Sequence, residues 1–360
     1  MPRVGKVKAI ISVFCVLGII VGTILIIPGW ILNRSNSNEY WKLTSPENVG
    51  MNSQILDNMI YDVENNNYNV YSILVIRNGC IVKEWYARFF HRDYLFRLYS
   101  VSKSITSTLI GIAVNKGFIS SLNETVLDFF PDKDIDNIDL QKESITIEHL
   151  LTMTTGLEWP EYYPYDDPRN PYFDWLESED HVEFVLNRTM IANPGQEFNY
   201  NTGATHLLAA ILERATNMST LDFAKQYLFN PLYIYDYYLL HDPQGVGCGG
   251  DGFFLRTRDM AKIGYLFLKN GIWEEIEIIT ENWVDSSTSS IVNLGSYGYG
   301  YQWWIYPNES CYQALGYGGQ VISVHYTLDL LVVFTGMDHN FDYPSYLINS
   351  YILPSIVEMD

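Results

Sequence analysis

The chain has 360 residues, of which 48% are hydrophobic, and it carries a formal net charge of −20. This length allows one large domain or two of ordinary size, and the apolar content predicts a folded core rather than a disordered chain. All 42 acidic residues lie after position 38. Because proteins bind nucleic acid by neutralising phosphates with Lys and Arg, no nucleic-acid partner is expected.

The N-terminus combines a short basic segment with a long apolar run. Three cations among the first eight residues precede residues 9–32, which carry no charge. As a helix this run would reach about 36 Å, enough to cross a bilayer. We therefore expect an N-terminal transmembrane helix at residues 1–33, retained as a signal anchor, and a polar stalk at 34–40. The positive-inside rule then predicts a single-pass protein of the cell membrane with its remaining residues outside the cytoplasm; cleavage as a signal peptide stays open.

A β-hairpin and a helix are predicted next along the chain. Residues 72–77 and 81–86 are β-rich, and Asn78-Gly79 between them is a strong turn signal. An apolar helix is expected from Ser100 to about Lys116, where the following glycine ends it.

The middle of the chain is predicted to be mainly helical. Short helices are expected at residues 146–151, after Gly203, and from Thr257 towards Gly271. Residues 159–175 contain several tyrosines and prolines, and this composition predicts a long ordered loop rather than one helix.

Strands return in the C-terminal third, at residues 301–305, 321–326 and 330–335, before a final helix at about 343–357. This order predicts an α+β fold, in which both chain ends build an antiparallel sheet flanked by helices. The expected α/β part covers about 41–120 and 250–360, and a mainly helical insertion covers about 121–249.

Ser100 and Lys103 form a Ser-x-x-Lys tetrad at the start of the predicted apolar helix. Residues three apart share one face of a helix, so the hydroxyl and the amine can meet. An amine of lowered pKa can take the proton of a serine and make it a nucleophile. The tetrad therefore predicts an acylation site, although it is too short to be specific without further motifs.

Two further sequence motifs, or stations of the predicted site, accompany the tetrad. They are residues 194–202, which contain Tyr200, and residues 316–320, with the sequence Gly-Tyr-Gly-Gly-Gln. Together with residues 146–156, 249–252 and 257–262, they resemble the serine beta-lactamase superfamily. Within it, the chain resembles class C beta-lactamase-like serine hydrolases, a group with esterases and relatives of 6-aminohexanoate-dimer hydrolase. The resemblance begins at about Trp41, runs to the C-terminus and implies a beta-lactamase/transpeptidase-like fold.

The resemblance implies catalytic roles for Ser100 as the acylated nucleophile, Lys103 as its amine partner and Tyr200. The sequence leaves open which of Lys103 and Tyr200 is the base, and the charge on Lys103 is expected to favour tyrosinate. The oxyanion and substrate contacts are expected from Ser100, Gln320, Gly319, Gly318, Tyr317, Thr202 and Asn201. Thr202 stands where the family's Tyr-x-Asn motif has asparagine, and Tyr317 stands where penicillin-binding relatives carry a cation.

The predicted activity is hydrolysis of a small-molecule ester or amide through an acyl-enzyme, without a cofactor. The alternative is an acyl-binding, penicillin-recognising sensor or scaffold with little turnover. No metal site is expected, because the histidines and cysteines lack zinc-ligand spacing. A disulfide among Cys80, Cys248 and Cys311 is possible, but the sequence selects no pair and predicts neither the natural substrate nor the oligomeric state.

Overall fold

The computed structural model describes residues 40–66, 68–338 and 343–357. The predicted anchor at residues 1–33 and residues 34–39 of the predicted stalk lie outside this part. Among the described residues, no helix has both the length and the apolar character needed to cross a membrane.

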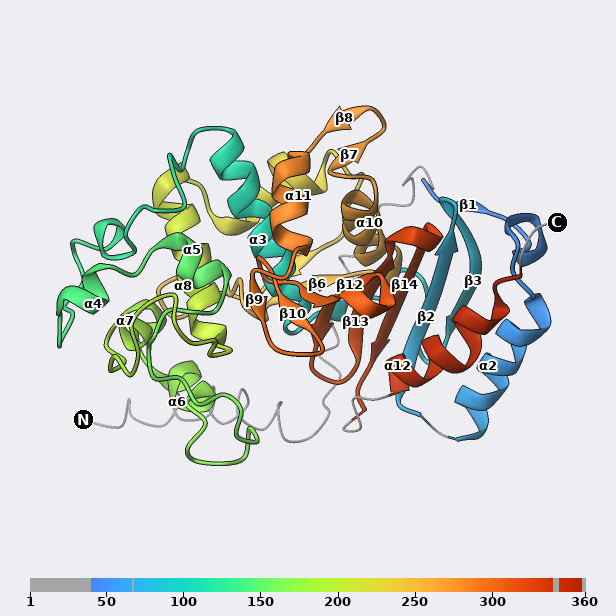
Figure 1. Cartoon of the computed structure of the whole chain (residues 1–360), viewed down its shortest axis with the longest axis horizontal. Coiled ribbons are helices and arrows are strands. Elements are labelled where there is room, and N and C mark those ends of the chain that lie inside the picture. The colour runs from blue at the N-terminus through green and yellow to red at the C-terminus, as the bar shows by residue number, and fades with distance from the viewer. Residues whose placement is uncertain (1–39, 67, 339–342, 358–360) are drawn as a thin grey trace, which may run out of the picture. The chain divides into compact units, whose positions relative to one another are not determined.

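A nine-stranded sheet forms one half of the described structure (Figure 1). Its order is β1-β3-β2-β14-β13-β12-β11-β10-β9, and all neighbours are antiparallel except the edge pair β1 and β3. The strands are β1 Lys42–Leu43, β2 Val70–Arg77, β3 Cys80–Tyr86, β9 Val292–Asn293, β10 Gly298–Tyr299, β11 Trp304–Tyr306, β12 Cys311–Gly316, β13 Gln320–His325 and β14 Leu330–Gly336. Strands from both chain ends meet where β2 pairs with β14, as the sequence order predicts.

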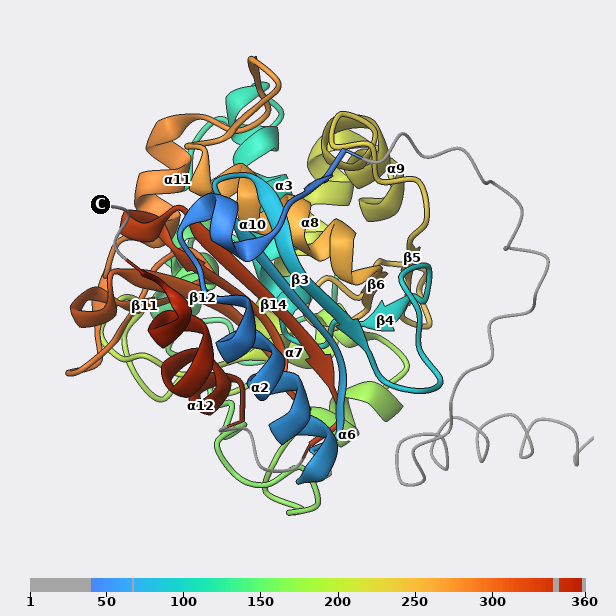
Figure 2. The same ribbon diagram turned by 90° about the vertical axis from the view of Figure 1, so that its right-hand side faces the viewer.

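Alternating apolar residues give the sheet two buried faces. On β2, Ile73 and Val75 belong to one apolar cluster, whereas Leu74 and Ile76 belong to the other. Helices α2 (Ser53–Asn65) and α12 (Tyr343–Leu347) lie side by side over the first face, as Figure 2 shows. The opposite face packs against α3 (Val101–Asn115) and α10 (Thr257–Leu268). The period of two along each strand therefore builds a three-layered half.

The other half is a group of helices that packs around α8, as Figure 1 shows in green and yellow. Its helices are α4 Leu140–Glu143, α5 Ile147–Leu151, α6 Tyr172–Glu177, α7 His181–Leu186, α8 Thr202–Thr216 and α9 Thr220–Ala224. The remaining elements are α11 Glu281–Thr288, the small sheet β4 Phe96–Arg97, β6 Phe253–Leu255 and β5 Tyr238–Leu239, and the hairpin β7 Ile272–Trp273 with β8 Ile276–Glu277. Because α3 packs against both α8 and β12, its first turn lies between the two halves.

Most of the elements predicted from the sequence are present. The turn at Asn78-Gly79 joins β2 and β3, and Asp329, with φ of 45°, ends the turn between β13 and β14. Helices α3, α5, α8 and α10 lie where the periodicity predicts them. The loop predicted at residues 159–175 is irregular only as far as Pro171, because α6 begins at Tyr172. The amphipathic helix α2 and the mostly buried strand β12 were not predicted.

Two predicted elements are wrong in their extent. The expected strand at 301–305 begins only at Trp304, because Gln302 takes a left-handed conformation. Its side-chain amide donates to the carbonyl oxygens of Leu150 and Leu151, so it ties α5 to the core instead of extending a strand. The expected final helix is α-helical only as far as Leu347. It continues as a π-helical turn at Ile348–Ile352 and a 3-10 turn at Leu353–Ser355.

No disulfide joins the cysteines of the described part: Cys80, Cys248 and Cys311 are free thiols. The disulfide that the sequence left possible among these three cysteines is therefore not formed. Cys80 lies in β3, Cys311 lies in β12 and Cys248 lies in the loop before β6, so the three thiols are held on separate elements.

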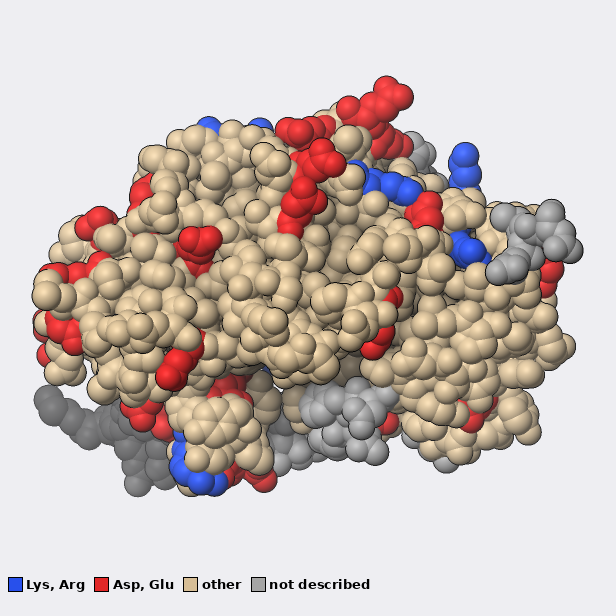
Figure 3. Space-filling view, in the orientation of Figure 1, with Lys and Arg blue, Asp and Glu red and all other residues tan. Residues whose placement is uncertain are grey.

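Acidic side chains are spread over the surface that Figure 3 displays, and Lys and Arg occupy fewer patches there. This distribution agrees with the net charge of −20 and offers no continuous basic surface on that face for a polyanion.

Candidate active site

The segment that leads to Ser100 is held against β6 by backbone hydrogen bonds. β4 pairs with β6, and the Leu98 amide continues this pairing by donating to the Phe253 carbonyl at 2.8 Å. Tyr99 then takes a left-handed conformation with φ of 47°. Such backbone strain in a non-glycine residue costs on the order of 1–3 kcal/mol and is common at functional sites. This strained residue places Ser100 at the N-cap of α3, where its side chain is half-buried.

Lys103 is 1% exposed and all three hydrogens of its ammonium form have acceptors. Its Nζ lies 3.0 Å from Ser100 Oγ, 2.9 Å from Thr202 Oγ1 and 2.9 Å from the Gly250 carbonyl oxygen. The predicted meeting of the tetrad's hydroxyl and amine is therefore present. In a neutral amine, two hydrogens would be held by Thr202 and Gly250, and the lone pair would face Ser100.

Burial lowers the pKa of Lys103 to about 8, although the charges of Glu161 and Asp251 act in the opposite direction. An ammonium loses hydration when it is buried, which disfavours the charged form. A substantial fraction of Lys103 is therefore neutral just above neutral pH. This is the property that a general base for serine requires.

Tyr200 lies beside the other two predicted catalytic residues. Lys103 Nζ lies 5.0 Å from the centroid of its ring, and the Ser100 hydroxyl is close enough to lower the pKa of Tyr200. Burial raises the pKa of Tyr200, the charge of Glu161 raises it further, and the Ser100 hydroxyl only partly opposes this. The expectation that Lys103 favours tyrosinate is therefore wrong. The low-dielectric surroundings keep Tyr200 a neutral phenol, which can donate a proton.

Glu161 is a buried carboxylate next to this group that the sequence analysis did not single out. Its Oε1 accepts from Thr202 Oγ1 at 2.6 Å and from Tyr165 Oη at 3.1 Å. Its Oε2 accepts from Trp159 Nε1 at 2.7 Å and from the Thr202 amide at 2.8 Å. Because the single hydroxyl hydrogen of Thr202 points to Glu161, Thr202 can only accept from Lys103. Glu161 thus orients the hydrogen bond that holds the lysine.

Asn201 and Thr202, both predicted to contact substrate, have other partners in the structure. Asn201 is fully buried, and its Oδ1 accepts from the Ala204 amide at 2.9 Å as the N-cap of α8. Thr202 Oγ1 lies between Lys103 and Glu161. Replacing the family's asparagine by threonine therefore places a hydroxyl in the lysine's surroundings.

The third predicted station lies against the Ser100 segment. A Cβ added to Gly316 would lie 2.4 Å from the Leu98 carbonyl oxygen, so the β12–β13 hairpin passes in direct contact with that backbone. Gly318 and Gly319 have φ values of 77° and 89°, which glycine adopts at little cost. Gln320 is buried, and its side-chain amide donates to the Gly336 carbonyl at 2.6 Å. The side chain of Gln320 is therefore structural, and the oxyanion contact expected of its backbone amide stays a prediction.

A row of half-buried tyrosines begins at Tyr99, next to Ser100 in the chain. The rings of Tyr99 and Tyr317 are 5.6 Å apart, and Tyr317 and Tyr165 are 5.7 Å apart. Arg97 stacks over Tyr99 at 4.7 Å and pairs with Asp251 at 2.6 Å. These rings offer flat apolar surface next to the Ser100 segment, and the arginine among them is already matched by a carboxylate.

His181, His206 and Asp242 form a separate buried cluster within the helical half. One possible ligand atom from each lies within 4.8 Å of the others, so this group has the donors of a metal site. The sequence analysis expected no metal site because these residues share no short spacing. The cluster is distinct from the group around Ser100 and Lys103.

The fold and the serine–lysine–tyrosine group define the class: an α+β sheet and a helical group with a Ser-x-x-Lys helix between them, as in serine beta-lactamases. The Beta-lactamase family profile matches residues 62–336. The chain belongs to the Beta-lactamase family, and the predicted family is confirmed.

Relatives by sequence and structure agree with this family. The chain is 25% identical over 261 residues to a 6-aminohexanoate-dimer hydrolase of Paenarthrobacter ureafaciens, which covers 66% of this chain and 64% of that protein. A Bacillus anthracis structure, described as a candidate 6-aminohexanoate-dimer hydrolase, has a TM-score of 0.70 and 21% identity, covering 82% of this chain and 81% of that one. EstCE1, a hydrolase with promiscuous acyltransferase activity, has a TM-score of 0.69 and 17% identity, covering 83% and 98%. These matched relatives are hydrolases, as was predicted for this chain, although the chain spans less than two thirds of the curated relative.

Proposed function

We propose that this chain is a serine hydrolase that forms an acyl-enzyme on Ser100, with neutral Lys103 as the general base. The observation that carries the proposal is the set of contacts around Lys103 Nζ. Thr202 and Gly250 hold this nitrogen with two hydrogen bonds, and Ser100 Oγ, its third partner, lies 3.0 Å away. A base must lie within hydrogen-bond reach of the proton that it abstracts, and Lys103 meets that requirement.

The reaction proceeds in two steps. Lys103 takes the Ser100 proton as Oγ attacks the ester or amide carbonyl. Backbone amides of Ser100 and Gln320 stabilise the oxyanion. Tyr200, a neutral phenol that contacts Ser100, donates its proton to the leaving oxygen or nitrogen and recovers one from Lys103. Water then attacks the acyl group with the same residues acting in reverse, which regenerates Ser100.

Uncharged esters, or amides without a free carboxylate, are the proposed substrates. Tyr317 stands where penicillin-binding relatives carry a cation, and Arg97 is already paired with Asp251. Tyr99, Tyr165 and Tyr317 provide aromatic surface for an apolar acyl or leaving group. A carboxylate at this position would lose hydration without gaining an unpaired cation.

A panel of p-nitrophenyl acetate, a D-amino-acid amide and nitrocefin tests this preference. We expect ester cleavage that is lost in Ser100→Ala, with poor nitrocefin turnover. Intact mass after reaction with a serine-directed phosphonate should show one adduct on the wild type and none on the variant. Efficient nitrocefin turnover with poor ester cleavage would reverse the substrate assignment, and an adduct that persists on Ser100→Ala would move the chemistry to another residue.

We further propose that residues 9–32 anchor the protein in the cell membrane with the hydrolase domain outside the cytoplasm. The support is the uncharged length of this run and the three cations before it. Fractionation of cells should recover the full chain with membranes, and a protease added outside should digest the domain. Recovery of the full chain in the soluble fraction would refute the anchor.

A further inference from the structure

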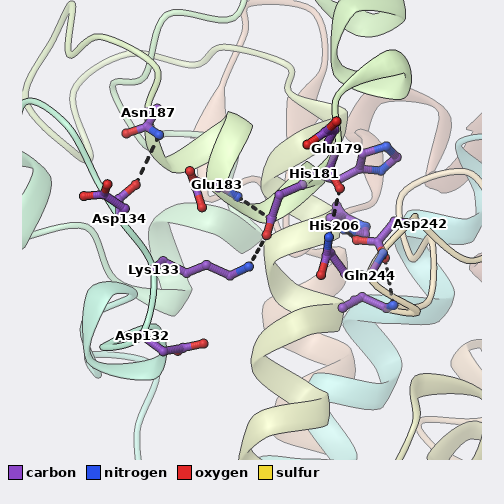
Figure 4. Close-up of polar contacts among 12 residues, drawn as sticks. Asp132, Lys133, Asp134, Glu179, His181, Glu183, Asn187, His206, Asp242 and Gln244 are labelled. Carbon is purple, nitrogen blue, oxygen red and sulfur yellow. Dashed lines mark hydrogen bonds and ion pairs between the residues drawn. The ribbon is translucent and has the colours of Figure 1, made fainter.

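A buried cluster of two imidazoles and one carboxylate lies in the helical half, outside the proposed hydrolase site. His206 comes from the middle of α8, His181 begins α7, and Asp242 lies in the loop between β5 and β6. Their exposed fractions are 0%, 3% and 7%. Figure 4 shows the three side chains gathered beside one helix. Residues distant in sequence have thus been brought together where water has little access.

Each histidine has one nitrogen with a partner and one without. His206 Nε2 lies 3.0 Å from Asp242 Oδ2, and His181 Nε2 lies 3.3 Å from the Leu176 carbonyl oxygen. Within the described part of the chain, neither Nδ1 has a hydrogen-bond partner. Buried polar atoms in native proteins are nearly always paired, so two unpaired nitrogens in one cluster indicate a missing ligand.

The donor atoms of the cluster are those that a metal cation binds. Where His181 Nε2 donates to the Leu176 carbonyl, the lone pair of its Nδ1 stays free. His206 Nε2 and Asp242 Oδ2 lie 3.0 Å apart, which is close to the spacing of two ligands on one cation. Neutral imidazoles and a carboxylate are the ligands that zinc takes in proteins.

The arrangement also resembles the outer contacts of known metal sites. A histidine that binds metal usually donates its other ring hydrogen to a carboxylate or a backbone carbonyl. His181 makes the second kind of contact through its Nε2, which leaves its Nδ1 for a cation. Asp242 is itself oriented, because its Oδ1 accepts from the amides of Gln244 and Val246 at 2.8 and 2.9 Å.

We propose that His181, His206 and Asp242 bind a zinc-class divalent cation, with one ligand atom from each. The potential ligand atoms lie within 4.8 Å of one another. Zinc–nitrogen distances of about 2.0–2.1 Å place tetrahedral ligands about 3.3 Å apart, so the cluster must contract on binding. His206 is fixed on a long helix, whereas His181 and Asp242 lie at a helix start and in a loop, and these can move.

A cavity of about 400 Å³ lies next to the cluster, although none of the three proposed ligands lines it, so a cation would reach them from this side only after a local movement. Its lining includes Val182, Ala210, Gln244 and Val246, the neighbours of the three proposed ligands along the chain or along α8. The charged residues of the lining are balanced, with Asp132 and Glu213 against Lys133 and Arg214. Because Asp242 shares its loop with Gly250, a bound cation would also fix the segment whose carbonyl accepts from Lys103.

The test uses the full chain without a histidine tag, stripped with a chelator and then given one equivalent of zinc chloride. Metal content is measured after gel filtration, for the wild type, His181→Gln, Asp242→Asn and the control His241→Gln. His241 is exposed and adjacent to Asp242, so it controls for loose binding by surface histidines. We expect one zinc per chain in the wild type and in the control. In the other two variants, affinity should fall by more than the roughly 10- to 100-fold that loss of an outer contact costs.

Cobalt(II) gives a second readout that does not depend on variants that fold. In the wild type we expect the intense visible bands of four-coordinate cobalt, and zinc should raise the melting temperature by mass action. Failure of the wild type to retain zinc, or equal retention by His181→Gln, Asp242→Asn and the wild type, would overturn the proposal. Neither readout depends on the hydrolase activity, so the two proposals fail separately.

Discussion

The buried groups around Lys103 and around His206 differ in how completely their hydrogen-bonding atoms are used. Around Lys103, each hydrogen of the ammonium has an acceptor, and Glu161 fixes the direction of the hydroxyl that takes one of them. In the histidine cluster, two imidazole nitrogens have no partner. A buried network that is complete without ligand can hold its groups ready for a reaction, whereas an incomplete one needs a ligand to be complete.

The two groups also place a basic nitrogen in two different buried environments. Lys103 keeps three polar partners, and burial lowers its pKa only to about 8, so both protonation states are accessible near neutral pH. His181 has one hydrogen-bond partner, at Nε2, and its Nδ1 has none among the described residues. The first environment suits proton transfer, and the second suits donation of a lone pair to a cation.

Ser100→Ala should have the largest effect on activity. Removing a serine nucleophile from a comparable catalytic group costs about 10⁶-fold in kcat. The hydroxyl accepts one hydrogen from Lys103, so its loss should leave the fold intact. Steady-state cleavage of p-nitrophenyl acetate measures the loss, and near-UV circular dichroism checks the fold. Activity within tenfold of the wild type would exclude Ser100 as the nucleophile.

Tyr200→Phe should follow, because it removes the proton donor but keeps the ring. General acid–base catalysis contributes about 10²- to 10⁴-fold, so kcat/KM is expected to fall in that range. The loss should be smaller for an activated aryl ester, whose leaving group needs no proton, than for an alkyl ester. Tyr162→Phe is the control, since that side chain is 76% exposed. Equal losses on both esters would contradict the assigned role.

Gly319→Ala should reduce stability and activity together. Its φ of 89° is strained for alanine, and the new Cβ would lie 2.2 Å from Tyr343 Oη, which donates to the Gly319 carbonyl. We expect a loss of at least about 1–3 kcal/mol of unfolding free energy, measured by urea denaturation. Gly245→Ala is the matched control, since its φ is 91° and nothing lies within 4 Å. Equal losses in the two variants would mean that the contact with Tyr343 contributes nothing.

Glu161→Gln should change both the pH dependence and the maximal rate. The charge of Glu161 raises the pKa of Lys103, so removing it lowers that pKa and extends activity to lower pH. A glutamine oxygen can still accept from Thr202 Oγ1, but the NH2 group would face Trp159 Nε1 and the Thr202 amide. Two hydrogen bonds of about 0.5–1.5 kcal/mol each are then lost, so the maximal kcat/KM should fall by about 5- to 150-fold. Glu158→Gln, in the same loop, is the control. An unchanged pH profile would show that Glu161 does not set the charge of the lysine.

Local patterns account for what the sequence could predict. Ser100 and Lys103 are three residues apart on one helix, so their contact follows from helix geometry. The β2–β3 and β13–β14 hairpins follow from alternating apolar residues around turn signals. Tyr200 could be assigned only because its motif resembles that of a known family.

The residues that the sequence analysis missed meet through distant parts of the chain. Glu161 lies in an irregular loop, and its partner Thr202 is 41 residues away, so no period connects them. His206 and Asp242 are 36 residues apart. The cap position of Asn201 had a signal in the sequence, since asparagine is favoured before a helix, but the family motif drew attention away from it.

The pH dependence of Ser100 phosphonylation tests the central claim that neutral Lys103 activates the serine. The second-order rate of labelling by a serine-directed phosphonate would be measured from pH 6 to 11 by intact mass. If the lysine is the base, the rate should rise with pH through about 8, as the amine loses its proton, and then remain level. A rate that is independent of pH in this range, or one that rises only above pH 10, would contradict the account.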